Sequence, residues 1–290
     1  MPLSSATARA TAPALAVSVR GVGRAFPGAA RGDSQRVVLR DIDLDIAAGE
    51  IVAMIGSSGC GKSTLLREVS GLDRPSTGQV AIDGSIVTGI DLRCAVAFQE
   101  PRLLPWRSIE RNVALGLPPA TDRRAGIDRV AALLELVGLT SSAALRPRQV
   151  SGGMAQRASL ARALARGPGV LVLDGPFGAL DALTRLRMQD LLLDIHSAEP
   201  ATILLVTHDV DEALYLADRV VLLGPDPNGP DGSSIRQVIE VPGTRPRDRG
   251  DATLAQLRAG LLGGLGVDSH HRSSLPTPTP TPTPTAGDTA

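Results

Sequence analysis

Nine consecutive residues in the first quarter of the chain have the types and spacing needed to hold phosphate groups. They match the pattern G-x-x-x-x-G-K-[ST] at every fixed position. The glycines allow a tight turn in which successive backbone N–H groups point at an anion. Lys62 would reach the β- and γ-phosphates of a nucleotide, and the Ser63 hydroxyl would bind Mg²⁺. The predicted phosphate loop consists of Gly56, Ser57, Ser58, Gly59, Cys60, Gly61, Lys62, Ser63 and Thr64.

The segments on either side of the phosphate loop are suited to position it. Residues 51–55 form an apolar run that is typical of a buried strand, and residues 63–69 predict a helix. The N-terminus of that helix would add its partial positive charge at the same point. A glycine-rich turn between a strand and a helix also occurs without a ligand, but the complete motif in this setting favours a nucleotide site.

Two further places in the sequence fit phosphate chemistry. Asp174 follows the apolar run 170–173, where an acidic residue would hold Mg²⁺ against the phosphates; taken alone, it would more often be a turn residue or a helix cap. Ser151 is a good N-cap for the helix that follows it. The next two residues are Gly152 and Gly153, although a glycine inside a helix costs about 1 kcal/mol relative to alanine. This pair indicates a second helix start that offers N–H groups to an anion.

The apolar periodicity predicts strands and helices over most of the chain. An antiparallel portion comes first, and it includes a small hairpin at residues 79–87 and a loop at 21–26. The pattern then turns helical over about 101–166, and beyond it strands alternate with helices, as in βαβ units. The sequence therefore predicts an α/β fold with a mostly parallel sheet, an antiparallel β subdomain and a helical insert. The expected strands are 15–20, 37–46, 51–55, 79–82, 85–87, 94–98, 170–173, 202–206, 219–223 and 235–241, and the expected helices include 63–69, 127–137, 186–195, 211–217 and 253–262.

Composition limits the classes of partner. The 290 residues include 30 basic and 30 acidic side chains, so no overall field favours nucleic acid or an anionic membrane. The two cysteines, Cys60 and Cys94, make no disulfide framework and suit a reducing cytoplasm. No apolar run approaches the roughly 18–20 residues that span a bilayer. We therefore expect a soluble chain with no nucleic-acid partner, which would need other subunits for any work in a membrane.

The expected organisation has four parts. They are a disordered leader at residues 1–13, a main domain at 14–245 that contains the helical insert at about 101–166, a C-terminal extension at 246–266, and a disordered tail at 267–290. The tail alternates Pro and Thr, cannot build a core, and is expected to be extended.

The order of the motifs resembles the ATPase subunit of an ABC transporter. The resemblance covers about residues 15–223 and implies the ABC ATPase fold, with ATP and Mg²⁺ as cofactors. It also implies a homodimer in which Ser151-Gly152-Gly153 of one subunit closes on the nucleotide held by the other. The motifs are the phosphate loop, Gln99, Ser151-Gly152-Gly153, Asp174, Ala179-Leu180-Asp181 and Thr207-His208-Asp209.

The same resemblance implies roles for single residues. Phe26 would stack on adenine, with core packing as the alternative. Gln99 would touch Mg²⁺ and the attacking water, and Asp174 would bind the metal. His208 would contact the γ-phosphate, with a capped turn as the alternative.

Other segments narrow the resemblance to a group of importers. Residues 98–106, 112–117 and 180–185 are similar to the group for nitrate, taurine and aliphatic sulfonates, and residues 241–247 are similar to its aliphatic-sulfonate branch. The implied partners are two membrane permease subunits and, indirectly, an extracytoplasmic substrate-binding protein. The chain would then be peripheral, on the cytoplasmic face of the cell membrane.

Within that group, residues 101–106 would face the coupling helix of the permease. The alternative is that Leu103, Leu104 and Trp106 pack inside the protein.

One position departs from the family pattern. The family places a Glu that polarises the attacking water directly after the Mg²⁺-binding Asp, whereas this chain has Gly175. A positioned general base is worth about 10²–10⁴ in rate, so hydrolysis is expected to be slow unless another group substitutes. Val150 and Met154, which replace Leu and Gln, are lesser departures because backbone N–H groups do most of the phosphate binding there.

Three alternatives to an aliphatic-sulfonate importer follow. The chain could be a catalytically weak nucleotide-binding or regulatory ABC protein, or it could serve a nitrate or taurine importer. An ABC protein that acts on nucleic acid or ribosomes is disfavoured, because the sequence has one phosphate loop, no long coiled-coil insert and no basic patch.

Overall fold

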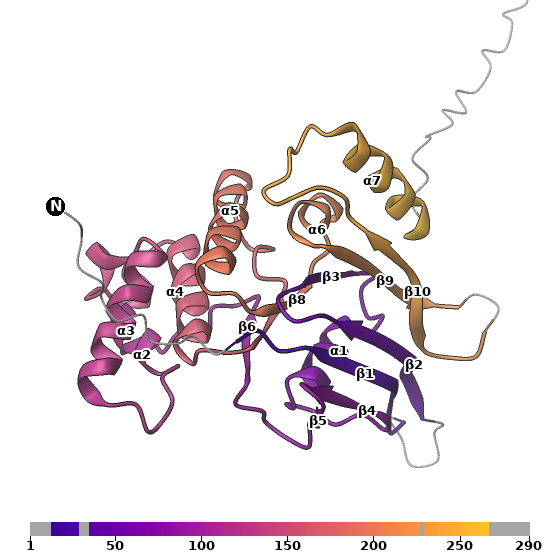
Figure 1. Cartoon of the computed structure of the whole chain (residues 1–290), viewed down its shortest axis with the longest axis horizontal. Helices are drawn as coiled ribbons and strands as arrows, with labels where there is room; N and C mark the ends of the chain where they lie inside the picture. The colour runs from indigo at the N-terminus through magenta and orange to yellow at the C-terminus, as the bar shows by residue number, and fades with distance from the viewer. Residues whose placement is uncertain (1–12, 29–34, 227–228, 267–290) are drawn as a thin grey trace, which may run out of the picture.

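The computed structural model describes residues 13–28, 35–226 and 229–266 of the chain (Figure 1). The predicted Pro/Thr-rich tail lies outside these residues, as does the predicted leader apart from Pro13. Within the described residues, the strands form one ten-stranded sheet in the order β5-β4-β1-β2-β10-β9-β3-β8-β7-β6.

The sheet has a parallel half and an antiparallel half. Strands β6, β7, β8, β3 and β9 each run parallel to their neighbours in this series, whereas β1, β2, β4 and β5 pair in antiparallel fashion. Strand β10 pairs antiparallel with β9 and meets β2 at Ser233 and Leu39, which joins the two halves. The strands are β1 (Val17–Phe26), β2 (Arg36–Ile46), β3 (Ile51–Ile55), β4 (Thr77–Ile82), β5 (Ser85–Ile86), β6 (Cys94–Phe98), β7 (Val170–Asp174), β8 (Thr202–Val206), β9 (Arg219–Pro225) and β10 (Ser233–Glu240).

The helices cover the two faces of the parallel half unequally. Helix α1 packs on one face, in the hydrophobic core that also contains residues of β1, β2 and β4. The other helices contribute to the core on the opposite face. The helical insert holds α2 to α4 and stands at one side of the molecule (Figure 1). The helices are α1 (Lys62–Val69), α2 (Ile109–Ala114), α3 (Arg123–Leu136), α4 (Gly152–Ala165), α5 (Ala182–Ala198), α6 (Val210–Leu216) and α7 (Ala252–Gly264), with two short 3₁₀ turns at Thr140–Ser142 and Pro147–Gln149.

Strand β3 shows why the sequence gives this layered fold. Successive side chains of a strand point to opposite faces. Ile51, Ala53 and Ile55 lie in the core of the larger helical face, while Val52 and Met54 lie in the core that contains α1. All five are at most 1% exposed, so the apolar run is the signature of a strand buried on both sides.

Most of the predicted elements are present, with shifted ends. The prediction of a loop at 21–26 is wrong, because β1 continues to Phe26 and pairs with β2 there. Its pairing is irregular between Val19 and Val22, and such a register shift breaks the alternation on which the prediction depended. The helix predicted at 127–137 begins earlier, at Arg123, and its apolar Ile127 is 56% exposed because α3 buries a narrow stripe.

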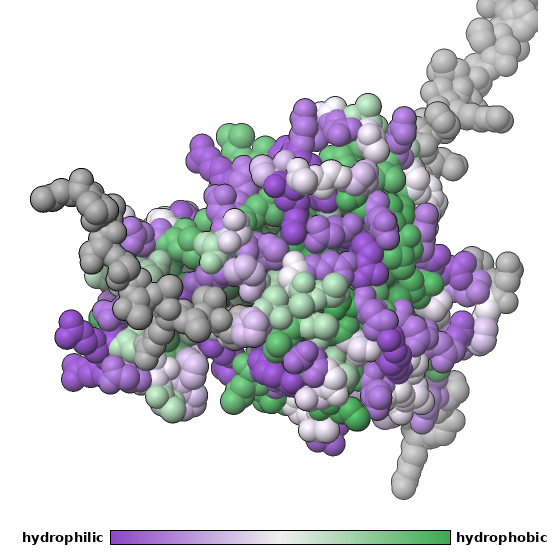
Figure 2. All heavy atoms as spheres, viewed as in Figure 1, coloured by the Kyte–Doolittle hydropathy of each residue, from purple (hydrophilic) through white to green (hydrophobic). Residues whose placement is uncertain are grey.

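In the residues that the structure describes, no helix is both long enough and apolar enough to cross a membrane. Hydrophobic residues reach the surface at several places between hydrophilic ones on the face shown in Figure 2. Trp106 is 67% exposed, so the alternative that this side chain packs inside is wrong, whereas Leu103 does pack against the larger core.

Candidate nucleotide site

The phosphate loop lies between β3 and α1, as the sequence predicted. Gly61 is the N-cap of α1 with φ at 98°, a left-handed conformation that favours glycine. The Lys62 side chain is 5% exposed, and its Nζ donates hydrogen bonds to the carbonyl oxygens of Gly56 at 2.8 Å and Ser57 at 2.9 Å. The loop therefore carries its own buried cation at the helix N-terminus, and both features favour the binding of an anion.

The two predicted metal ligands, Ser63 and Asp174, meet in the structure. Ser63 Oγ donates a hydrogen bond to Asp174 Oδ1 at 3.0 Å, and Asp174 is the last residue of β7, which is separated from β3 by β8 in the sheet. A hydroxyl and a carboxylate are the oxygen ligands that Mg²⁺ prefers, usually together with substrate phosphates. Among the described residues no group of three or more His, Cys, Asp or Glu side chains could hold a metal by itself. The residues present therefore fit a Mg²⁺ ion that arrives with a nucleotide.

A cavity of about 400 Å³ gathers most of the predicted site residues. Phe26, Gln99 and His208, which lie far apart in the sequence, share its wall with the phosphate loop and Asp174. Sequence reasoning missed three lining residues, Arg36, Val38 and Val206. The complete lining is Phe26, Arg36, Val38, Ser58, Gly59, Gly61, Lys62, Ser63, Thr64, Gln99, Asp174, Gly175, Val206 and His208.

The missed residues carried no motif. Arg36 and Val38 stand on β2 and reach the cavity only because β2 pairs with β1 beside the loop. In the sequence Arg36 is one of many arginines and nothing distinguishes it. Once the structure places it beside the phosphate loop, its guanidinium is a candidate for phosphate binding.

His208 and Phe26 both line this cavity. The cap of α6 is Asp209, whose carboxylate accepts hydrogen bonds from Asp211 N at 2.9 Å and Glu212 N at 3.1 Å, so His208 itself does not cap the helix. The Phe26 side chain belongs to neither hydrophobic core of the described residues and faces the cavity instead.

Gly175 forms part of the cavity wall directly after Asp174. Its φ is +58°, and its N–H donates to the carbonyl of Val206 at 2.9 Å. A Cβ built on this residue would lie 3.7 Å from the side chain of Gln99, which is ordinary contact. A side chain therefore has room at this position, but the left-handed backbone would be strained by about 1–2 kcal/mol.

The second predicted anion site lies apart from this cavity. Ser151 caps α4 by accepting a hydrogen bond from Met154 N at 3.3 Å, as the sequence predicted. Neither Ser151 nor the two glycines after it line the cavity. Gly153 is buried, and a Cβ there would lie 2.6 Å from Cγ2 of Thr184, so it allows α4 to pack against α5. Gly152 is exposed and faces open space, so packing does not explain it.

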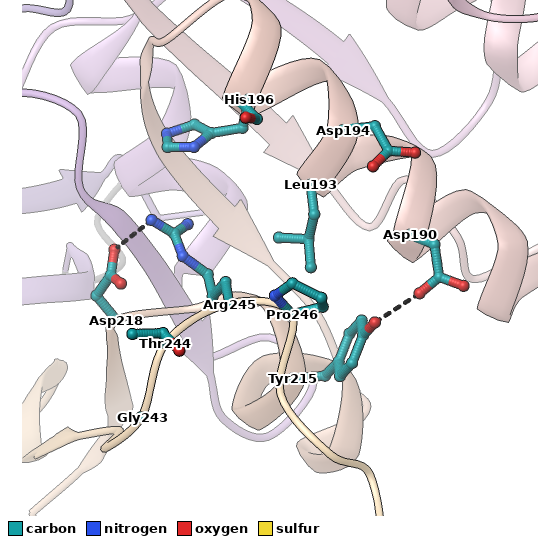
Figure 3. A pocket seen from close by; sticks show the side chains of 11 residues that line it. Asp190, Leu193, Asp194, His196, Tyr215, Asp218, Gly243, Thr244, Arg245 and Pro246 are labelled. Atoms are coloured by element: carbon teal, nitrogen blue, oxygen red, sulfur yellow. Dashed lines mark hydrogen bonds and ion pairs between the residues drawn. The ribbon is translucent and has the colours of Figure 1, made fainter.

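A larger cavity of about 830 Å³ lies between α5, the end of α6 and residues 243–246 (Figure 3). Several of its polar groups pair with one another. The Tyr215 hydroxyl donates to Asp190 at 2.6 Å, and Arg245 forms an ion pair with Asp218 at 3.3 Å (Figure 3). None of the predicted site residues lines it.

One property of the site concerns the whole sequence. Lys62 is the only lysine in the chain, since every other basic side chain apart from the histidines is an arginine. The side-chain amine of this protein is therefore confined to the phosphate loop.

The sequence of the chain is similar to those of known proteins. The family model described as "ABC transporter" matches residues 39–178. The protein named "Aliphatic sulfonates import ATP-binding protein SsuB 1" of Xanthomonas axonopodis pv. citri is 50% identical over 234 residues, which is 79% of this chain and 91% of that protein. The protein of the same name from Streptomyces avermitilis is 47% identical over 266 residues, which is 92% of each chain.

Solved structures agree with the fold. The structure described as "Dimeric structure of a post-hydrolysis state of the ATP-binding cassette MJ0796 bound to ADP and Pi" superposes with a TM-score of 0.67 at 28% identity, and it covers 79% of this chain and 100% of that one. A second structure, "Dimeric Structure of MJ0796, a Bacterial ABC Transporter Cassette", gives the same TM-score at 29% identity. The phosphate loop is in place, and half of the residues aligned with the Xanthomonas relative are identical over 91% of that protein, so the chain belongs to the ATP-binding subunits of ABC transporters, a family of ATPases.

Proposed function

We propose that this chain is the energy-coupling subunit of an importer for aliphatic sulfonates, and that it works with Mg-ATP. The observation that carries the proposal is that one cavity holds the phosphate loop, Asp174, Gln99 and His208 together. The relatives from Xanthomonas and Streptomyces, whose names specify aliphatic sulfonates, support the choice of cargo.

Each side chain has a role that follows from its place. Lys62 and the loop N–H groups bind the phosphates, and Ser63 and Asp174 hold Mg²⁺, with Gln99 beside them. The bound metal would neutralise charge that develops on the phosphate oxygens. Gln99 positions the attacking water, and His208 contacts the γ-phosphate. Phe26 stacks on adenine across the cavity.

The working assembly is a homodimer. Because Ser151, Gly152 and Gly153 do not line the cavity of their own chain, the helix start that they form, where Ser151 and Gly152 are exposed, is available to the nucleotide of a second copy. Gly152, exposed and without a packing role, offers its N–H group for that purpose. Two membrane permease subunits, served by an extracytoplasmic substrate-binding protein, hold the dimer peripherally on the cytoplasmic face of the membrane, and the exposed Trp106 contributes to the contact with them.

The test measures the growth of cells of the organism that encodes this chain, after its gene has been deleted. They are supplied with ethanesulfonate, taurine or sulfate as the sole sulfur source, or with nitrate as the sole nitrogen source. The expected result is loss of growth on ethanesulfonate, restored by the native chain and not by Lys62→Ala. Loss on taurine or nitrate alone would transfer the proposal to those cargoes, and growth on every source would refute it.

A second candidate rests on Gly175. With glycine in place of the catalytic Glu, the chain binds Mg-ATP and dimerises on it but turns over slowly by itself. A bound partner or another carboxylate would then have to supply the base.

A further inference from the structure

The guanidinium of Arg24 lies over the ring of Phe26, with its central carbon 4.6 Å from the ring centroid. Phe26 lines the nucleotide cavity, whereas Arg24 is not part of the lining. The guanidinium therefore covers ring surface that the cavity does not use. A flat cation over one side of an aromatic ring is attracted to its electron-rich face.

Arg24 is itself held in place from a second element. Its Nη2 forms an ion pair with Asp73 at 2.9 Å, and its Nη1 donates to the carbonyl oxygen of Arg74. The side chains of Arg24 and Asp73 are only 18% and 30% exposed, so this pair is partly shielded from water. The turn that contains Asp73 follows α1, the helix that begins at the phosphate loop.

The same turn also grips the backbone of β1 next to Phe26. Ser76 N donates to the carbonyl of Gly23 at 2.8 Å, and Ala25 N donates to Ser76 Oγ at 3.1 Å. The end of β1 is therefore fastened, through backbone and side chain, to the segment that follows the phosphate-binding helix.

A buried carboxyl on α1 adds to this connection. Glu68 is 1% exposed, and neither of its oxygens has a hydrogen-bond partner among the described residues. Arg24 is the cation whose charge acts on it, and the Nε of Arg24 is also buried without a partner. The charge of Arg24 thus acts on a buried carboxyl of α1 as well as on the aromatic ring.

We propose that Arg24 is a positioning residue for the nucleobase: it fixes the ring of Phe26 so that the free side of the ring stacks on adenine. The inference rests on the proposed function of the cavity, in which Phe26 faces the base. A ring that is already immobilised loses less conformational freedom when a ligand stacks on it, so Arg24 strengthens base binding without touching the nucleotide. Phosphate binding, which depends on the loop and Lys62, gains nothing from it.

The experiment compares two ligands on the full-length chain by isothermal titration calorimetry, each with Mg²⁺. One ligand is ATP, and the other is inorganic tripolyphosphate, which has the phosphates and no base. Arg24→Gln is expected to weaken ATP binding about threefold to tenfold and to change tripolyphosphate binding less than twofold. Phe26→Leu gives the effect of losing the ring itself, which sets the upper limit for Arg24→Gln.

Two further variants separate positioning from general stability. Arg24→Lys keeps a cation over the ring and a partner for Asp73, so it is expected to recover most of the ATP affinity that Arg24→Gln loses. Arg20→Gln is the matched control, because Arg20 lies on the same strand and pairs with Asp45 on the exposed surface, at 2.6 Å, away from the ring. It is expected to bind both ligands as the native chain does.

The inference would be overturned if Arg24→Gln lost equal affinity for ATP and for tripolyphosphate, or if Arg24→Gln bound ATP as tightly as the native chain does. It would also be overturned if Arg24→Lys failed to recover the ATP affinity that Arg24→Gln loses. A native chain that binds neither ligand would instead refute the proposed function. The two failures are therefore distinguishable.

Discussion

Gln156 on α4 donates a hydrogen bond from its side-chain nitrogen to the carbonyl oxygen of Phe98, at 3.1 Å. Gln156 is 4% exposed. Phe98 is the last residue of β6 and directly precedes Gln99. Ser151 caps the same helix, α4. The bond therefore joins, within one chain, the helix start proposed to reach a second copy's nucleotide and the Gln99 of its own cavity.

Removing this bond should separate turnover from nucleotide affinity. Gln156→Leu leaves the partly buried carbonyl of Phe98 without this donor, which costs at most about 1–3 kcal/mol of stability. Because Gln156 does not line the cavity, the Kd for Mg-ATP should stay within twofold while the ATPase rate of the assembled transporter falls several-fold. Gln149→Ala is the control, since its side chain accepts only a local backbone bond from Arg146. Unchanged turnover in Gln156→Leu would show that the bond does not couple the two segments.

Amine chemistry should report on the nucleotide site alone. Lys62 is the only lysine and is 5% exposed, with its Nζ bonded to two carbonyls. An amine-reactive ester is therefore expected to add at most two groups, at Lys62 and at the α-amino end of the chain, and Mg-ATP should slow the addition at Lys62. Intact-mass and peptide mass spectrometry give both results. If saturating Mg-ATP did not slow the labelling of Lys62, the nucleotide would have to bind elsewhere.

Restoring the missing carboxylate should raise turnover. Gly175→Glu places an acid beside Gln99, where a Cβ has room, although the φ of +58° strains any side chain. The expected steady-state ATPase rate is at least tenfold above that of the native chain. Gly175→Gln carries the same backbone strain without the base, so it is the matched control and should not exceed the native rate. Equal rates for the native chain and Gly175→Glu would mean that another group already supplies the base.

Stability should decline as pH rises through the range in which two buried carboxyls ionise. Burial raises the pKa of Glu68 to about 7, and burial likewise raises the pKa of Glu212 to about 7. Each carboxyl holds its proton more tightly in the folded chain than in the unfolded one, where its pKa is near 4.5. Their contribution to the free energy of unfolding is therefore full below pH 4.5 and is lost as pH rises from about 4.5 to about 7.

Glu68→Gln tests this directly, because an amide cannot ionise. The variant should be more stable than the native chain at pH 8, by at most about 3 kcal/mol, and its stability should depend less on pH between 5 and 8. Urea unfolding at a series of pH values measures the difference. An identical pH dependence in the two chains would mean that Glu68 does not titrate in this range.

The sequence was sufficient for features that depend on neighbouring residues. The phosphate loop, β3 and α1 follow from a local motif and local apolar runs, and Ser151 and Asp174 were placed by their relation to the adjoining helix and strand. These predictions needed no knowledge of the tertiary structure.

Contacts between distant segments could not be predicted in this way. The extension of β1 to Phe26 is a result of pairing with β2, not of the intrinsic preference of a stretch with two glycines. Arg36 enters the cavity wall through the same pairing. The hydrogen bond from Gln156 to Phe98 joins residues 58 positions apart, and no periodicity in either segment predicts it.

Because the one lysine is buried, no exposed side chain of this protein offers an amine to amine-reactive reagents. A conservative Arg107→Lys exchange, next to the exposed Trp106, would install a single exposed side-chain amine, in addition to the α-amino group, while Mg-ATP shields Lys62. A bifunctional cross-linker attached at residue 107 would then identify the neighbouring subunit, and no other lysine would have to be replaced first.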